Sequence, residues 1–346
     1  MAMKVLLGMS GGVDSAYAVI RLREMGYEVE GAIIKMHEYT ELDSAKKCAA
    51  ELSVPLHVIS GEAEFSSIVK QNLVTEYSSG RTPNPCIICN ERVKFRLLAD
   101  YAERFGIDRI ATGHYARVVR IDGAGATRHA VAMSESEKDQ SYMLYRLPED
   151  ILSKLILPLA DMKKQDVRAA CSEAGLSSSE KKDSMEICFL PNGRHYEFVE
   201  AECGSRHLGN FVNTRGEVLG PHDGICRYTV GQRKGLGISL GERVFVTDIN
   251  PITNDITLSD SFPGVTETRI SDVVFSGISM DELATGDVPE LYVRVRYTAP
   301  LVKCTARLLE DGEVLLSFST PLRIAKGQSA VLYHDGRVML GGIIKG

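Results

Sequence analysis

A glycine-rich segment near the start of the chain, Gly8-Met9-Ser10-Gly11-Gly12-Val13-Asp14-Ser15, separates a short apolar run from an amphipathic one. The apolar run at 5–7 is typical of a buried strand, and the spacing of apolar residues over 16–25, closed by Gly26, predicts a helix. Glycines let the backbone approach a ligand, and the first N–H groups of a helix lack intrahelical partners. The segment therefore predicts a phosphate-binding loop.

The type of phosphate loop follows from what the segment contains. It has no Gly-Lys-Ser/Thr at the spacing of a Walker A loop, and it is not Gly-x-Gly-x-x-Gly. Ser-Gly-Gly-Val-Asp-Ser resembles the pyrophosphate loop of the N-type ATP pyrophosphatases, which cleave ATP to AMP and pyrophosphate. The alternative is an ordinary tight turn between a strand and a helix, which the matching residues in register with both elements disfavour.

Length and composition set the class of protein. The chain has 346 residues, which suggests two or three domains, and its 44% hydrophobic and 25% charged content is that of a soluble globular protein. The net charge of −6 argues against a general nucleic-acid coat but leaves room for a local basic face. No leader at Met1 and no apolar run of ~18 residues is evident. We therefore expect a cytoplasmic protein with no membrane or DNA partner.

Strands and helices alternate through the first part of the chain. Patterns typical of strands occur at 28–34, 54–59 and 109–111, with helical patterns at 41–52 and 64–77. This alternation predicts an α/β fold with a parallel sheet covered on both faces, in which ligands bind beyond the carboxyl ends of the strands. Ile34, at the end of the second strand, should therefore line the nucleotide site. Gly113 and His114 follow the end of the fourth strand at the same edge, where His114 has either a structural or a functional role.

Two cysteines lie in the sequence Asn84-Pro85-Cys86-Ile87-Ile88-Cys89-Asn90. Two prolines and a glycine predict an irregular loop over 80–90, followed by a helix over 90–105. Cys89 would then lie at a helix N-terminus, where the helix dipole lowers a thiol pKa and favours the reactive thiolate. Three basic residues should act in the same direction: Arg92, Lys94 and Arg96. The alternative is an inert core cysteine.

The pattern changes at Gly193 to short strands separated by glycine turns. We place one domain boundary near 193 and a second within 259–266. The last part is all-β by pattern, with a half-buried strand over 291–297. Basic segments at 227–243 and 294–307 favour binding to nucleic acid over a merely solvated face. Eight cysteines in such a chain are not a disulfide framework, so some should be buried fillers and others ligands or reactive thiols.

Taken together, these motifs resemble those of the tRNA-specific 2-thiouridylases (the MnmA/TrmU family). The resemblance runs through 8–15, 82–90, 111–117, 138–140, 183–189 and 228–237. It implies an ATP pyrophosphatase (adenine nucleotide alpha hydrolase-like) domain at 1–192, a small central β-rich domain at 193–262 and a tRNA-contacting C-terminal β-barrel at 263–346. It also implies tRNA-uridine 2-sulfurtransferase activity. In this reaction ATP adenylates the 2-carbonyl of a wobble uridine, and sulfur from a protein persulfide then gives 2-thiouridine, AMP and pyrophosphate.

The resemblance also assigns roles to residues. The nucleophilic cysteine falls on Cys89 and the persulfide-bearing cysteine on Cys188. Nucleotide contacts fall on Gly8, Met9, Ser10, Gly11, Gly12, Val13, Asp14, Ser15, Ile34 and Gly113. Target-base contacts fall on Asn84, Pro85 and Cys86, and further tRNA contacts on Lys138, Asp139, Gln140, Arg296, Tyr297 and Gln328, with His114 close by. Many members of the family have Asp where this chain has Cys86.

Cofactors follow from the same chemistry. ATP requires Mg²⁺ to neutralise its phosphates, with Asp14 placed to help. Cys86, Cys89 and Cys188 would converge on one pocket, which suits a [4Fe-4S] cluster with one open iron as well as a persulfide relay that passes through a Cys89–Cys188 disulfide. Zinc would need a fourth ligand that these motifs do not supply. The expected partners are a tRNA with a wobble uridine and a sulfur-donor protein.

Two other functions fit part of the sequence. An ATP pyrophosphatase that amidates a small molecule explains the glycine-rich loop but neither Cys89 with Cys188 nor the basic β-rich tail. A non-enzymatic RNA-binding protein that senses ATP explains the basic segments but needs no reactive thiol. Mutation of Cys89 separates these alternatives, because only thiolation depends on it.

Overall fold

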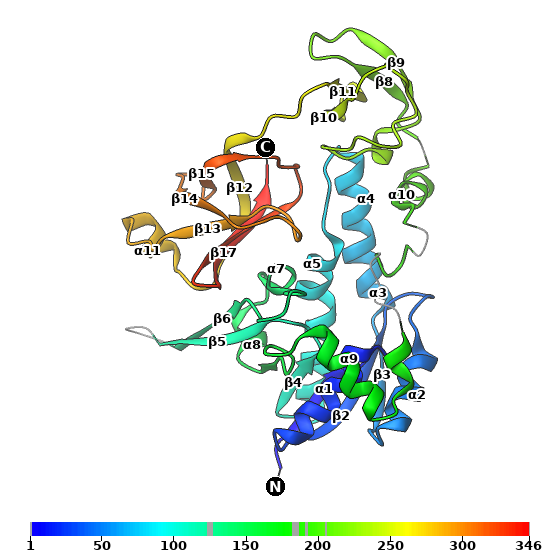
Figure 1. Ribbon diagram of the computed structural model, residues 1–346, viewed down its shortest axis with the longest axis vertical. Helices are drawn as coiled ribbons and strands as arrows, with labels where there is room; N and C mark the ends of the chain where they lie inside the picture. Colours follow the sequence, from blue (N-terminus) through cyan, green and yellow to red (C-terminus); the bar gives the residue numbers. More distant parts are fainter. Residues whose placement is uncertain (1, 123–126, 182–186, 191–192, 205, 346) are drawn as a thin grey trace. The chain divides into compact units, whose positions relative to one another are not determined.

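The computed structural model describes residues 2–122, 127–181, 187–190, 193–204 and 206–345 (Figure 1). The chain divides into two compact units, each built from discontinuous segments. The first unit comprises Met1–Ile68, Cys86–Phe189 and Asp335–Met339, and the second comprises Val69–Pro85, Leu190–His334 and Leu340–Gly346. No helix in the described part of the chain is both long and apolar enough to cross a membrane.

A five-stranded parallel sheet organises the first unit, with strand order β3-β2-β1-β4-β7. Its strands are β1 (Lys4–Gly8), β2 (Glu28–Lys35), β3 (Leu56–Ser60), β4 (Arg109–Thr112) and β7 (Leu155–Ile156). The crossovers include α1 (Val13–Glu24), α2 (Leu42–Glu51) and α6 (Phe95–Arg104), and α9 (Lys164–Glu173) follows the last strand. The predicted α/β fold with a parallel sheet is confirmed.

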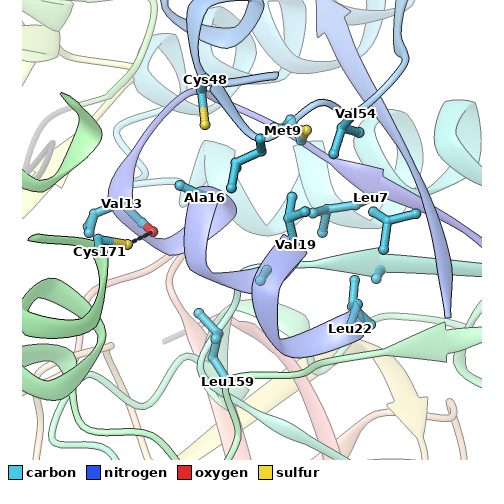
Figure 2. Close-up of a cluster of buried hydrophobic side chains, with 14 of the residues drawn as sticks. Leu7, Met9, Val13, Ala16, Val19, Leu22, Cys48, Val54, Leu159 and Cys171 are labelled. Atoms are coloured by element: carbon cyan, nitrogen blue, oxygen red, sulfur yellow. Dashed lines mark hydrogen bonds between the residues drawn. The ribbon is translucent and has the colours of Figure 1, made fainter. Parts of the chain in front are cut away.

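Buried side chains around α1 fix the start of that helix in place (Figure 2). Its inner face carries Val13, Ala16, Val19 and Leu22, all at most 4% exposed. Two cysteines from neighbouring helices, Cys48 and Cys171, complete this cluster, and the Cys171 thiol donates to the Val13 carbonyl oxygen at 3.5 Å. Burial raises the pKa of both thiols to about 11, so they are packed neutral fillers, as expected for part of the cysteine set.

The helix that carries Cys86 and Cys89 starts earlier than predicted. It begins with α5 (Pro85–Cys89), continues through the π-helical turn η2 (Asn90–Lys94) and enters α6. The irregular loop predicted over 80–90 is therefore wrong in its second half. Proline is well tolerated at the first helical position, where its missing N–H would have no intrahelical partner anyway.

An antiparallel hairpin follows β4 in the first unit. It consists of β5 (Arg117–Asp122) and β6 (Thr127–Ala132). The residues between the two strands, 123–126, lie outside the described part of the chain. Short helices follow, α7 (Ser141–Leu144) and α8 (Glu149–Leu152). Arg337, at the start of β17 (Arg337–Ile344), pairs with Ala132.

The second unit contains a four-stranded sheet with order β10-β11-β8-β9. Its strands are β8 (Gly209–Val212), β9 (Val218–His222), β10 (Phe245–Asn250) and β11 (Asp255–Ser259). β8 and β9 form a hairpin, in which the chain turns at Gly216, whose φ is +81°. This unit also contains the helices α4 (Gln71–Ser78), α10 (His195–Cys203) and α11 (Met280–Thr285), although no helix was expected after Gly193.

The six antiparallel strands β12 to β17 form a barrel, which closes because β12 pairs with both β15 and β17. Its other strands are β13 (Leu291–Arg294), β14 (Val302–Leu308), β15 (Val314–Leu322) and β16 (Ser329–His334), and β12 spans Val265–Phe275. The predicted C-terminal β-barrel is confirmed. The strand expected over 291–297 ends at Arg294, so Arg296 and Tyr297 lie in a turn.

Candidate functional site

The glycine-rich loop joins β1 to α1 with its backbone amides at the helix start. Gly12 is the N-cap, and the Ser15 hydroxyl donates to the Gly12 carbonyl oxygen at 2.9 Å. The Ser10 hydroxyl lies 3.4 Å from that of Ser15. The first amides of α1 lack intrahelical acceptors and carry the positive end of the helix dipole. This geometry suits an anion such as the phosphates of ATP.

Two glycines permit the close packing that this loop requires. Gly11 has a φ of +73°, and a Cβ atom there would lie 2.5 Å from the backbone of Ser44. A Cβ atom on Gly113, just after β4, would lie 2.9 Å from the carbonyl carbon of Asp14. Gly113 therefore lets β4 approach the start of α1. Ile34, the other predicted nucleotide contact in this unit, is a core side chain with 8% exposure.

Asp14 is the centre of a charged cluster that the sequence did not predict. The Lys164 ammonium at the start of α9 donates to both carboxylate oxygens, at 2.8 and 2.6 Å. The Tyr115 hydroxyl donates to the same carboxylate at 2.6 Å. Lys164 is only 11% exposed, so this ion pair is shielded from water on most sides. The pair places a cation beside the predicted phosphate site.

Gln140 supports this cluster from behind. The Gln140 side-chain carbonyl accepts from the backbone amide of Tyr115 at 3.0 Å. The Gln140 backbone amide donates to the Tyr115 backbone carbonyl at 2.6 Å. Asp139, which is 8% exposed, accepts from the backbone amides of Ser134 and Ser141. Asp139 therefore orders its own loop and Gln140 ties that loop to Tyr115, whereas Lys138 beside them is half-buried.

Cys89 is buried, and its environment differs from the predicted one. Its thiol is 7% exposed and lies 3.7 Å from the Met36 sulfur. Burial raises its pKa, and the Lys94 ammonium opposes that rise. The expected lowering of the pKa at a helix start is wrong, because Cys89 ends α5 inside a continuous helix that starts at Pro85. The other expected cations, Arg92 and Arg96, are paired with Glu91 and Asp150.

Cys188 belongs to the same unit and is exposed. Desolvation by its neighbours and the nearby Cys86 and Cys89 thiols raise its pKa to about 11, against a smaller opposing effect of Lys94. The next residue, Phe189, is 5% exposed and packs edge-on against Phe65, with 5.2 Å between ring centroids. This buried ring anchors the backbone beside Cys188. The motif residues at 183–186 lie outside the described part of the chain.

The three thiols do not form a metal centre in the structure. All eight cysteines are free, and the described residues contain no group of three or more His, Cys, Asp and Glu side chains that could hold a metal ion. The [4Fe-4S] ligand set expected from Cys86, Cys89 and Cys188 is therefore not assembled. The expected disulfide between Cys89 and Cys188 is also not supported, since both thiols are free.

The raised pKa of Cys188 predicts how its alkylation depends on pH. A thiol with a pKa of about 11 is ~0.1% thiolate at pH 8, compared with roughly a quarter for a free cysteine of pKa ~8.5. Because the thiolate increases as pH rises toward that pKa, iodoacetamide should modify Cys188 about tenfold faster per pH unit from 8 to 10. Peptide mapping measures the rate, with glutathione as the reference thiol. A plateau near pH 8.5 would contradict this result.

His114 and the barrel residues complete the predicted set. The His114 Nδ1 atom lies 2.8 Å from the Thr112 hydroxyl, and burial lowers its pKa to about 3, so the ring is neutral at pH 7. Arg296 is exposed and donates to the Arg323 carbonyl at 3.1 Å. The Gln328 carboxamide donates to the Thr82 carbonyl at 2.9 Å. The structure thus gives Gln328 an intramolecular partner.

Comparison with known proteins covers the chain in three consecutive parts. Residues 3–192 match a family described as tRNA methyl transferase HUP domain. Residues 196–260 match one described as tRNA methyl transferase PRC-barrel domain, and residues 266–344 match one described as aminomethyltransferase beta-barrel domain.

Full-length relatives are more informative. The chain is 41% identical over 361 residues to a tRNA-specific 2-thiouridylase MnmA of Clostridium perfringens, an alignment that covers 99% of this chain and 98% of that protein. It is 38% identical over 356 residues to a protein of the same name from Lachnoclostridium phytofermentans, with 98% of each covered. Among solved structures, an NMN synthetase from Francisella tularensis aligns with 59% of this chain and 78% of its own at 19% identity and a TM-score of 0.33, a likeness too low to carry an argument.

Proposed function

This chain belongs to the tRNA-specific 2-thiouridylase family, and from that premise we propose that it uses ATP to replace the 2-oxygen of the tRNA wobble uridine by sulfur. The observation that carries the proposal is one compact unit holding both a phosphate-type helix start and the Cys89 and Cys188 thiols. The helix start binds the ATP that activates the uridine, and the two thiols deliver the sulfur. Eight free thiols suit the reducing cytoplasm.

Activation of the uridine falls to the loop at 8–15. A carbonyl oxygen is a poor leaving group, so the uridine O2 first attacks the α-phosphorus of ATP and pyrophosphate leaves. The amides at the start of α1 hold phosphate oxygens, and Lys164 stands beside them to balance the charge that develops on pyrophosphate. Asp14 and Tyr115 hold the Lys164 ammonium in position. Gly113, which has no side chain, lets the end of β4 lie close to Asp14.

The residues present suit Mg²⁺ only as a companion of the nucleotide. Asp14 offers one carboxylate, and both of its oxygens accept from Lys164. The described residues hold no cluster that could bind a metal without further ligands. Mg²⁺ commonly takes one or two carboxylates with substrate phosphates and water, so Asp14 is the residue that we propose beside it. When bound, it neutralises phosphate charge.

Sulfur transfer falls to the two cysteines. The terminal sulfur of a persulfide on Cys188 bonds to C2 of the adenylated uridine, and the C2–oxygen bond breaks to release AMP. The Cys89 thiolate attacks the Cys188 sulfur, so the persulfide S–S bond breaks and a Cys89–Cys188 disulfide forms. An external thiol then reduces that disulfide, and a sulfur-donor protein reloads Cys188. Lys94, which favours the charged form of both thiols, assists the attack.

We further propose a division of labour along the chain. Residues 1–192 activate the base and transfer sulfur, 193–262 form the central domain, and 263–346 contact tRNA. The matched ranges support these bounds. Target-base contacts are proposed for Asn84, Pro85 and Cys86, and tRNA contacts for Lys138, His114, Arg296 and Tyr297. Asp139 already bonds within its own loop and Gln140 to Tyr115, so we propose that both support tRNA binding by shaping the loop at 134–141.

Methyl transfer, which two of the family descriptions name, is the second candidate. It would require neither a pyrophosphate-type loop nor two cysteines in the same unit. The test is mass spectrometry of tRNA nucleosides after incubation with ATP, Mg²⁺ and a persulfide donor. We expect 2-thiouridine with equal amounts of AMP and pyrophosphate. Methylated uridine without ATP cleavage would overturn the proposal, and four iron and four sulfide per chain after anaerobic purification would overturn the persulfide route.

A further inference from the structure

We propose that Gln328 is a positioning residue that holds the loop leading into the catalytic helix, rather than simply a contact for tRNA. This inference concerns three barrel residues, Lys326, Gly327 and Gln328, which we call the barrel clamp. They lie just before β16, and two of them, Lys326 and Gln328, bond to residues 82–83, far away in sequence but in the same compact unit. The effect of the barrel clamp on the reaction rests on the roles proposed above for Asn84, Pro85 and Cys89.

The clamp makes three hydrogen bonds to this loop. The Gln328 Nε2 atom donates to the Thr82 carbonyl at 2.9 Å and to the Pro83 carbonyl at 3.4 Å. The Thr82 amide donates to the Lys326 carbonyl at 2.8 Å. One side chain and one backbone carbonyl therefore satisfy both backbone polar groups of Thr82.

The loop needs such a partner because of its composition. Pro83 and Pro85 have no N–H group, so residues 82–85 cannot form a regular strand ladder or a helical turn. Carbonyls with no backbone donor nearby must find side-chain donors or water. A carboxamide offers two N–H donors on one atom, which matches two successive carbonyls.

Backbone packing at Gly327 makes the contact close. Gly327 has a φ of +88°, and a Cβ atom there would lie 3.0 Å from both the Arg81 Cβ and the Thr82 amide nitrogen. On the other side the clamp is fixed to the barrel, since the Gly327 amide donates to the Ile344 carbonyl at 2.9 Å and the Ile344 amide to the Gln328 carbonyl at 2.8 Å. The Arg81 guanidinium is itself held by Glu76 of α4, at 2.7 and 2.6 Å.

The clamp therefore fixes the entry to α5. Two residues separate Thr82 from Pro85, where the helix carrying Cys86 and Cys89 begins. Pro83 and Pro85 stiffen that span, so displacement of Thr82 is transmitted along the chain. Gln328 therefore acts on the proposed reaction through this loop, which continues along the chain into the helix that carries Cys86 and Cys89.

Hydrogen exchange of the protein without tRNA tests the clamp. We expect Gln328→Ala to speed exchange of the Thr82 amide, and of peptides covering 81–89, by about tenfold, since two hydrogen bonds of ~1 kcal/mol or less each are lost. Gln328→Glu keeps the size of the side chain but turns an acceptor toward two carbonyls, so it should act in the same direction. Peptides from β14 should be unchanged in both variants, which shows that the barrel is folded.

The matched control is Arg296→Ala, an exposed barrel residue outside the clamp. It should leave exchange at 81–89 unchanged while weakening tRNA binding and lowering its log–log salt slope by about one unit. Unchanged exchange at 81–89 in both Gln328 variants would overturn the inference and leave Gln328 as a tRNA contact only. The exchange experiment itself contains no ATP, tRNA or sulfur donor, so a negative result in it is distinct from failure of the proposed activity.

Discussion

Cys89→Ser should abolish 2-thiouridine formation, by at least ~10³-fold, while tRNA-dependent release of pyrophosphate from ATP continues. Serine keeps the shape of the side chain, and α5 holds residue 89 in a buried position that tolerates a hydroxyl beside Met36. What is lost is the thiolate that attacks the Cys188 persulfide. Single-turnover assays that follow pyrophosphate and thiolated nucleoside separately measure the two steps.

The adjacent Cys86 provides a matched comparison, because it lies on the same short helix but is exposed. Cys86→Asp introduces the residue common at this position in the resembling family, and we expect thiolation within about threefold of the unmodified protein. A cluster held by three cysteines would instead lose all activity in both variants. Cys203→Ser, far along the chain and half-buried, should change neither step. Loss of pyrophosphate release in Cys89→Ser would contradict the assigned role.

Local patterns in the sequence predicted the first unit well. The strand, glycine loop and helix at 4–24 follow from short-range periodicity and from glycines, and these rules hold because β1 and α1 are buried on the faces that the pattern marks. The parallel order of the strands follows from their alternation with helices. The all-β character of the C-terminal part was likewise evident in its alternating residues.

The errors share one physical cause, which is tertiary context. In α10, Tyr196 and Phe198 alternate with glutamates as in a strand, yet the segment is helical. Neighbouring side chains hold it, since His195 stacks on Tyr77 at 4.3 Å and the Arg227 guanidinium lies 4.4 Å from the Tyr196 ring. The pKa of Cys89 was misjudged because burial, which no local pattern reports, outweighs the effects of charge and dipole.

Lys164 was missed for the same reason. It lies 150 residues from Asp14 in sequence, and a lysine at the start of a helix is ordinarily a solvated surface residue. Nothing in its neighbourhood, Met162-Lys163-Lys164-Gln165, distinguishes it from Lys163 beside it. Only the fold shows that Lys163 is exposed whereas Lys164 is 11% exposed and bonded to the loop at 8–15.

Lys164→Ala should therefore lower the rate of adenylation by ~10²–10³-fold, an effect typical of removing one donor from a developing negative charge. Two effects combine. The variant loses the ammonium beside the phosphates, and it leaves the Asp14 carboxylate without the cation that balances it. Repulsion between that carboxylate and ATP adds to the loss. The measurement is pyrophosphate release at saturating ATP, with thermal unfolding to confirm the fold.

A double-mutant cycle separates the two effects. If Asp14 serves mainly to hold Lys164, the double variant Asp14→Asn/Lys164→Ala should be no slower than Lys164→Ala alone, because the uncompensated charge is gone. Lys163→Ala is the matched control, since this neighbour is exposed, and it should retain full activity. Equal losses for Lys163→Ala and Lys164→Ala would show that only general surface charge matters. Additive losses in the double variant would instead mean that Asp14 acts on ATP independently, as a ligand of Mg²⁺ would, and that the two residues do not work as one pair.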